Sequence, residues 1–381
     1  MRDVYLDYAA ATPVDEAVLS AMEPYYSDVF YNPSAMYLPA QKAREALESA
    51  RKRVASRLGV RSNEVIFAAG GTEGNNIAIA GIMANFPNCS VAVSAIEHDS
   101  VLEPARQFNC SVALSTAQGR VDLDDLRKKI SENTVLVSVM YANNEVGTIQ
   151  PLRQIAAMLE TIRHERRSGG NRLPIYFHTD ACQAANYLDL HVEKLGVDLM
   201  TLNGGKLYGP KQSGMLYVAD HVKLQPLIRG GGQERGLRSG TENVAGALGF
   251  ATALDMAQTM RHAEVSRLNE VKKQAIHLLN QKIPGVIING SDKQRLPNNI
   301  HITLPGCDNE RVLLLLEQQG ILAAAGSACS ASSEEPSHVL RALGMSDTDA
   351  RSSIRLTTGR ATTLEDMRLC VNTLTDIAKS K

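Results

Sequence analysis

The sequence predicts an α/β protein with a large domain on a mostly parallel seven-stranded sheet and a smaller α+β domain. Three observations predict this fold. The chain has 381 residues, enough for roughly two to three domains. Short apolar runs alternate with amphipathic stretches, which is typical of a buried sheet covered by helices. From about residue 245 a long helical pattern with few strand signals leads into a second unit.

Seven apolar runs are predicted to form the large sheet. They are Glu64–Phe67, Ser90–Ser94, Ser111–Leu114, Val135–Met140, Ile175–Thr179, Leu199–Leu202 and Met215–Val218. Amphipathic stretches such as Val121–Ile130 and Leu152–Arg166 lie between them and predict covering helices. Because strands and helices alternate and the strands are almost wholly apolar, a parallel sheet buried on both faces is favoured.

The second unit is predicted to follow one long helix, Ala245–Gln281. A strand at Asn299–Leu304, a helix at Glu310–Gln319 and a final helix from about Leu364 complete it. The first fifteen residues contain one short extended run, which we assign to the same unit. The predicted domains are therefore residues 16–250, and residues 1–15 together with 251–381.

Composition excludes several classes of protein. Forty basic and 41 acidic side chains give a net charge of -1, which argues against a surface adapted as a whole to nucleic acid or to an anionic membrane. No run approaches about 18 apolar residues, so no membrane span is expected. The N-terminus lacks a signal-peptide pattern. The six cysteines form no CxxC pair, so we expect neither a disulfide framework nor a metal site, and a cytoplasmic location.

Chemically active side chains follow the predicted strands, and ligands of such sheets bind beyond the carboxyl ends of the strands. After the first strand, Gly71 and Thr72 open a helical pattern. Thr72 is predicted as the N-cap, and bare N–H groups there would hold a phosphate. Tight strand–helix packing would explain the same glycines without any ligand.

Further polar residues follow the next strands. His98 follows the second strand. A single histidine there would suit a structural role as well as a catalytic one. Asn144 belongs to a pair of asparagines that would also suit a simple turn. Asp180 ends an apolar strand, where a carboxylate needs a cationic partner. Gln183 lies one helical turn further on.

Lys206 follows a strand and two glycines, where a desolvated amine can form a Schiff base. In chain order the candidates are a phosphate turn, a ring-stacking histidine, an acid for a ring nitrogen and an amine. Pyridoxal phosphate needs this set of groups.

Long motifs then carry a family resemblance over nearly the whole chain. They are YLDYAAATPVD, NPSA, GGTEGNN, EH at 97–98, NNEVGTIQP, HTDACQ, KLYGPK, GGGQERGLRSGTENV, GSACSASSEEPSHVLRALGM and SSIRLTTGR. With these motifs the chain resembles cysteine desulfurases of the NifS/IscS type in the class V aminotransferase superfamily. The resemblance implies a fold-type I pyridoxal-phosphate enzyme and a homodimer.

The resemblance assigns a role to each matching residue. The catalytic residues would be Cys329, Lys206 and His98. The cofactor would be bound by Lys206, Gly71, Thr72, His98, Asn144, Asp180, Gln183, Asn203 and Gly205, with Thr241 reaching the phosphate of the neighbouring subunit. Asn32 and Arg355 would hold the substrate carboxylate, a role suited to the planar fork of arginine.

The implied activity is the removal of sulfur from L-cysteine, which gives L-alanine and a persulfide on Cys329. The small, polar residues around Cys329 do not suit a core position. A sulfur-acceptor or iron–sulfur scaffold protein would then take the sulfur for cluster assembly or tRNA thiolation. Two alternatives stay open: a lyase of the same superfamily that prefers selenocysteine, and a non-catalytic partner protein.

The chain also departs from the family pattern beside the lysine. The family has Ser-x-His there, and both side chains contact the cofactor phosphate, whereas this chain has Asn203 and Gly205. Asn203 can still donate a hydrogen bond, but Gly205 offers only its backbone. This departure motivates the non-catalytic alternative and predicts weaker cofactor binding.

Overall fold

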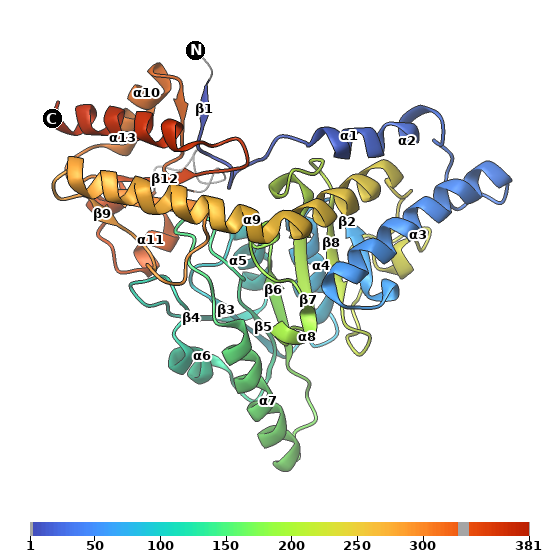
Figure 1. Cartoon of the computed structure of the whole chain (residues 1–381). Helices are drawn as coiled ribbons and strands as arrows, with labels where there is room; N and C mark the ends of the chain where they lie inside the picture. The colour runs from blue at the N-terminus through green and yellow to red at the C-terminus, as the bar shows by residue number, and fades with distance from the viewer. Residues whose placement is uncertain (1–2, 327–334, 381) are drawn as a thin grey trace.

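The structure is a computed structural model that describes residues 3–326 and 335–380 (Figure 1). Its centre is a seven-stranded sheet in the order β2-β8-β7-β6-β5-β3-β4. The strands are β2 (Val65–Ala68), β3 (Ser90–Ser94), β4 (Asn109–Ala113), β5 (Thr134–Ser138), β6 (Tyr176–Asp180), β7 (Leu199–Asn203) and β8 (Gly214–Val218). β8 runs opposite to the other six strands, which are parallel to one another. The predicted seven-stranded, mostly parallel sheet is confirmed.

Helices of the same unit cover the sheet or pack beside it, because its strands are apolar on both faces. They are α1 (Glu16–Met22), α2 (Pro24–Ser27), α3 (Leu38–Leu58), α4 (Gly71–Met83), α5 (Asp99–Arg106), α6 (Leu123–Lys129), α7 (Leu152–Ser168) and α8 (Val192–Leu195). Short 3₁₀ turns lie at η1 (Ser62–Glu64), η2 (Gly204–Lys206) and η3 (Glu234–Gly236). All five residues of β3, β5 and β8 are buried, as expected for strands covered on both sides.

A second, smaller core forms around a three-stranded antiparallel sheet. Its strands are β9 (Ile287–Ile288), β10 (Asn299–Thr303) and β12 (Ser353–Thr357), in the order β12-β10-β9. The helices α10 (Asn309–Gln318) and α13 (Leu364–Lys379) pack on this core. The short helices α11 (His338–Ala342) and α12 (Asp347–Ala350) instead pack in a separate cluster with Ile96, Met140 and Val146. β1 (Val4–Tyr5) pairs in parallel with β11 (Ile321–Leu322).

The long helix α9 (Val244–Lys282) belongs to both cores. Its first half contributes Phe250 and Leu254 to the core of the large sheet, and its second half contributes Ala275 and Leu279 to the smaller core. Figure 1 shows α9 running from one unit to the other. The predicted boundary at residue 250 falls inside this helix, and the division into two domains stays a prediction.

Three strands of the smaller unit, β9, β11 and β12, have no counterpart among the predicted ones, and β12 is the longest of them. β12 reads Ser-Ile-Arg-Leu-Thr, so only two of its five residues are apolar. All five are nevertheless buried. Its polar residues find partners in the tertiary structure: Arg355 pairs with Asp7, and the hydroxyl of Ser353 bonds that of Thr303. A pattern of apolar residues does not detect a strand of this kind.

Candidate active site

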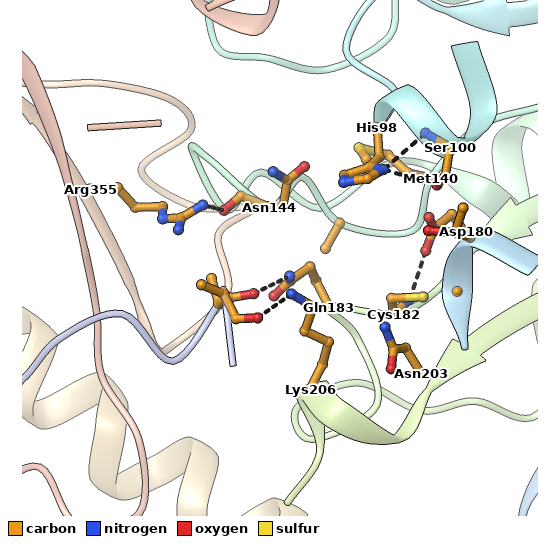
Figure 2. A pocket seen from close by; sticks show the side chains of 15 residues that line it. His98, Ser100, Met140, Asn144, Asp180, Cys182, Gln183, Asn203, Lys206 and Arg355 are labelled. Carbon is orange, nitrogen blue, oxygen red and sulfur yellow. Dashed lines mark hydrogen bonds between the residues drawn. The ribbon is translucent and has the colours of Figure 1, made fainter. Parts of the chain in front are cut away.

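A cavity opens at the carboxyl ends of the central strands and gathers most of the predicted site residues (Figure 2). Nine of them line it: Gly71, Thr72, His98, Asn144, Asp180, Gln183, Asn203, Lys206 and Arg355. The other lining residues are Ala9, Ala10, Ser100, Met140, Ala142 and Cys182. Residues that are more than 340 positions apart in the chain therefore line one cavity. The rule for doubly wound sheets accounts for those that follow the strands of the large sheet, but not for Ala9, Ala10 or Arg355.

The start of α4 supplies the phosphate turn. The N-cap is Gly70, whose φ of 132° and ψ of -170° suit glycine almost alone. The prediction that Thr72 is the N-cap is wrong, because this glycine turn starts the helix at Gly71, and Thr72 lies inside the first turn. The first N–H groups of a helix have no acceptor within it, so they are available to an anion.

Gly71 also lies where the backbone of α4 comes close to the cavity floor. A Cβ atom there would come within 2.8 Å of the sulfur of Cys182. Burial and nearby Asp180 raise the pKa of the Cys182 thiol well above its ordinary value. Cys182 therefore lines the cavity as a neutral thiol, and it is unsuited to be a nucleophile.

Asp180, at the end of β6, presents a buried carboxylate that is only 7% exposed. Its Oδ1 accepts a hydrogen bond from the backbone N–H of Cys182 at 2.9 Å. Its Oδ2 accepts one from Nδ2 of Asn75 at 2.7 Å. Both donors are neutral amides, so neither neutralises the charge. A positively charged ligand atom in the cavity would do so.

His98 is the N-cap of α5, and its ring is held by the first turn of that helix. The backbone N–H of Ser100 donates to Nδ1 of His98 at 3.0 Å. The hydroxyl oxygen of Ser100 lies 2.9 Å from the same nitrogen (Figure 2). Because Nδ1 accepts, a neutral His98 carries its proton on Nε2.

The N-terminal segment forms the opposite wall. Lys206, at the end of η2, donates from Nζ to the carbonyl of Ala10, and Nε2 of Gln183 donates to the carbonyl of Ala9 at 3.0 Å (Figure 2). Gln183 does not lie in a helix as expected but in a run of turns after β6. Thr12 anchors the segment, since the N–H of Tyr208 donates to its hydroxyl oxygen at 2.8 Å.

The unusual turn before the lysine is well formed. Oδ1 of Asn203 accepts from the N–H of Gly205 at 3.0 Å and thereby caps η2. Gly205 itself does not line the cavity. Its φ lies outside the left-handed region, and a Cβ atom there would have its nearest neighbour at 3.5 Å. The backbone therefore does not require glycine at 205.

Arg355 reaches the cavity from β12 with a side chain that is 1% exposed. One NH2 hydrogen goes to Oδ1 of Asp7 at 2.6 Å, and NH1 donates to the carbonyl of Asn144 at 3.1 Å. Its Nε has no hydrogen-bond partner in the described part of the chain. A guanidinium has five N–H donors, so donors remain for a carboxylate ligand.

Besides Gly205, two predicted residues of the described chain, Asn32 and Thr241, do not line this cavity. Asn32 is exposed and accepts from the N–H of Ser34, and its neighbour Pro33 lines a different cavity. Thr241 is also exposed and does not line the cavity. Cys329 lies outside the described residues.

Sequence reasoning missed the residues that support this site. Asp7 pairs with Arg355, and Asn75 and Ser100 hold Asp180 and His98. Asp7 stands alone in an apolar stretch, Leu-Asp-Tyr, which is the one signal that could have drawn attention to it. Nothing in the sequence marks Asn75 or Ser100.

Comparison with known proteins decides the family. The model for "Aminotransferase class-V" matches residues 4–369. The chain belongs to the class-V aminotransferase family. Pyridoxal phosphate is accordingly its cofactor, and the protein is a pyridoxal-phosphate-dependent enzyme.

Named relatives cover nearly the whole chain. The chain is 40% identical to a cysteine desulfurase IscS of Dictyoglomus turgidum over 98% of this chain and 94% of the relative. It is 39% identical to one of Methanosarcina thermophila over 99% and 92%. A solved NifS-like protein superposes with a TM-score of 0.90 at 30% identity over 100% of both chains. SspA in complex with cysteine superposes with a TM-score of 0.78 at 33% identity over 93% and 98%.

The residues of the cavity fit pyridoxal phosphate. The buried, un-neutralised carboxylate of Asp180 suits a protonated ring nitrogen, and the start of α4 at Gly71 suits the phosphate. Lys206 supplies the amine. Within residues 3–326 and 335–380 there is no cluster of three His, Cys, Asp or Glu that could hold a metal ion. The same residues contain no helix that could cross a membrane.

Proposed function

We propose that this protein is a cysteine desulfurase, a sulfurtransferase that removes sulfur from L-cysteine, releases L-alanine and carries the sulfur as a persulfide on Cys329. The observation that carries the proposal is one cavity that combines Asp180, Lys206, His98 and Arg355 in a chain 40% identical to a cysteine desulfurase. The structure with bound cysteine among its similar proteins supports the substrate.

Arg355 binds the carboxylate of the cysteine. Asp7 and the carbonyl of Asn144 each take one hydrogen of its guanidinium, and so they fix its plane. The remaining donors face a ligand carboxylate, and paired N–H donors on one carboxylate give both strength and orientation. A substrate held in this way keeps its amino group near Lys206.

The cofactor, once bound, withdraws electrons from the substrate and makes its α-hydrogen acidic. Asp180 holds a proton on the ring nitrogen, because a buried carboxylate is stabilised by a cation beside it. Lys206 accepts the α-proton at Nζ. His98 lines the same cavity with its proton on Nε2, so it is placed to donate a proton to the substrate.

Cys329 takes the sulfur as a thiolate, and the C–S bond of the substrate breaks as the S–S bond forms. The thiol of Cys182 lines the cavity, but its pKa is raised by burial, so it does not compete as a nucleophile. An acceptor protein then removes the persulfide sulfur for iron–sulfur cluster assembly or tRNA thiolation. A cytoplasmic location stays a prediction.

The active form is proposed to be a homodimer. Large apolar side chains are exposed on the segment from α1 to the start of α3, and Met36 is 92% and Leu38 73% exposed. Such a patch is typical of an interface. Thr241 is exposed and away from its own cavity, as a residue that serves a partner's phosphate site would have to be.

The decisive experiment compares wild type with Cys329→Ser. With L-cysteine, wild type is expected to form alanine and a protein persulfide in equal amounts in the first turnover. Cys329→Ser is expected to keep the cofactor but to form almost no alanine, because its hydroxyl is a poor nucleophile toward sulfur.

Cys307→Ser is the matched control and is expected to behave as wild type, because Cys307 belongs to the second core. Alanine formation by Cys329→Ser at the wild-type rate would refute the proposal. Rapid turnover of selenocysteine without any turnover of cysteine would identify a selenocysteine lyase instead.

A further inference from the structure

Asn75 is a completely buried polar residue near the cavity that no step of the mechanism uses. It lies on α4, one turn beyond the phosphate turn, and its side chain is 0% exposed. Both hydrogens of its amide are used. Nδ2 donates to Oδ2 of Asp180 at 2.7 Å and to the hydroxyl oxygen of Ser100 at 2.8 Å.

The two bonds fix the amide in one orientation. Its carbonyl oxygen, Oδ1, is buried without a hydrogen-bond partner among the described residues. A flip of the amide would place Oδ1 against Oδ2 of Asp180, where two acceptors would repel each other. The amide therefore leaves its own acceptor unpaired, which is costly, and keeps two donated bonds.

These contacts link three parts of the site. Asn75 holds Asp180 at the end of β6 and Ser100 in the first turn of α5, and Ser100 in turn holds Nδ1 of His98. Helix α4, which begins at the phosphate turn, thus also donates a hydrogen bond to Asp180, the predicted partner of the ring nitrogen. The spacing between phosphate turn and acid is set by one rigid helix.

We propose that Asn75 is a positioning residue that holds the carboxylate of Asp180 in place and aimed at the ring nitrogen of the cofactor. A hydrogen bond donated to a carboxylate favours its charged form, and Asn75 gives one of the two such bonds that Asp180 receives. The inference rests on the proposed function only in that both use pyridoxal phosphate.

The test measures binding to the apoprotein rather than turnover. The two probes are pyridoxal phosphate and its 1-deaza analogue, in which a C–H group replaces the ring nitrogen. Wild type is expected to prefer pyridoxal phosphate, because only this probe can form the ion pair with Asp180. Asp180→Asn is expected to abolish the preference and serves as the positive control.

Asn75→Leu is expected to reduce the preference by about tenfold, the effect of losing one hydrogen bond to a charged group. Ser100→Ala removes the other bond of Asn75, together with the hydroxyl contact to His98, but leaves the bond from Asn75 to Asp180, so it is expected to retain most of the preference. Asn85→Leu is the matched control: the same substitution just past the far end of α4, where the amide of Asn85 bonds the carbonyl of Lys223. It is expected to leave the preference unchanged.

If Asn75 had a purely structural role, its loss would weaken the binding of both probes equally. An unchanged preference for pyridoxal phosphate in Asn75→Leu would therefore overturn the inference. An equal loss of preference in Asn85→Leu would do the same. Should Asn75→Leu not fold, Asn75→Ser keeps one donor in a smaller side chain and is expected to lose part of the preference. Failure of the proposed desulfurase activity would appear separately, in the alanine assay of the wild type.

Discussion

The turn before Lys206 shows how one residue can depart from a family pattern without breaking the site. Asn203 replaces the family serine and still accepts the N–H of Gly205, so the 3₁₀ turn that carries the lysine forms normally. Gly205 has neither a left-handed φ nor a neighbour that a Cβ atom would strike. A side chain is therefore tolerated at 205, and its absence costs only the phosphate contact that it would make.

Gly205→His is expected to bind pyridoxal phosphate about tenfold more tightly, since a hydrogen bond to a charged group contributes about 1.5–3 kcal/mol. Titration of the apoprotein with the cofactor measures this. Gly169→His, at the C-terminal end of α7, controls for a general effect of an added histidine. Equal or weaker binding in Gly205→His would mean that the backbone N–H groups of this turn already satisfy the phosphate.

Glu97 illustrates a second effect at the residue scale. It is fully buried beside His98, and its Oε1 accepts from the N–H of Met140 at 2.8 Å and from the hydroxyl of Ser94. Its Oε2 has no partner among the described residues. Burial raises the pKa of this carboxyl to about 8. At neutral pH the folded protein therefore holds Glu97 mainly protonated.

This raised pKa predicts a pH dependence of stability. Between the ordinary glutamate pKa of 4.5 and the folded value of about 8, the folded state binds one proton more than the unfolded state. The contribution of Glu97 to stability is therefore complete below the unfolded pKa and is lost as the pH rises through the folded pKa, by up to about 1.4 kcal/mol per pH unit.

Glu97→Gln mimics the neutral carboxyl and removes this loss. Its stability relative to wild type is expected to rise as the pH goes from about 5 to about 8, measured by urea unfolding at each pH. Glu365→Gln, at a side chain 83% exposed, controls for the chemical change. A difference between wild type and Glu97→Gln that does not vary with pH would contradict the prediction.

At the scale of elements, the site depends on the turns that connect strands to the helices that follow them. β2 leads into α4 through Gly70, β3 leads into α5 through His98, and β7 leads into η2 through Asn203. In each case the N-cap residue faces the cavity edge of the sheet. Parallel strands place these turns at one edge, so the caps of separate helices come together in one site.

Gly70→Ala tests the first of these turns. A Cβ atom at 70 would meet no atom closer than 3.8 Å, so only the backbone conformation, with φ at 132°, opposes alanine. The variant is expected to be about 1–3 kcal/mol less stable and to bind the cofactor less tightly, because the first N–H groups of α4 are turned away. Gly169→Ala, where φ is -83°, is the control and is expected to be nearly neutral. Unaltered stability and cofactor affinity in Gly70→Ala would show that this turn relaxes freely.

At the scale of the whole molecule, the cavity is shared by segments from both ends of the chain. Arg355 comes from the smaller unit, and it is fixed by Asp7 from the N-terminal segment. Lys206 and Asp180 come from the large sheet. α9 contributes side chains to both cores, so it ties the substrate-binding arginine to the cofactor residues.

The exposed apolar patch around Met36 and Leu38 is the proposed dimer interface. Met36→Asp together with Leu38→Asp places two charges in the exposed apolar patch and is expected to shift the protein from dimer toward monomer in light scattering, with loss of activity. Leu114→Asp changes another apolar residue, 61% exposed after β4, and is expected to leave the dimer intact. A double variant that stays dimeric would place the interface on another surface.

The sequence by itself determined the large sheet, the long helix and most of the residues of the cavity. These features are local: strands show as apolar runs, α9 as a continuous helical pattern, and Asp180, Lys206 and His98 stand in fixed order just after strands. Because parallel strands all end at one edge, the order along the chain was enough to predict that these side chains meet. The strand bounds differ from the predicted ones by at most a few residues.

Only the tertiary structure decided which residues support these groups. The bonds of Asn75 to Asp180 and Ser100, and of Asp7 to Arg355, join residues 25 to 348 positions apart. Their side chains are polar, so the sequence alone does not distinguish them from surface residues, and only the folded chain shows their partners. β12 was missed for the same reason. Its polar side chains can be buried because they find hydrogen-bond partners in segments that are distant in the sequence.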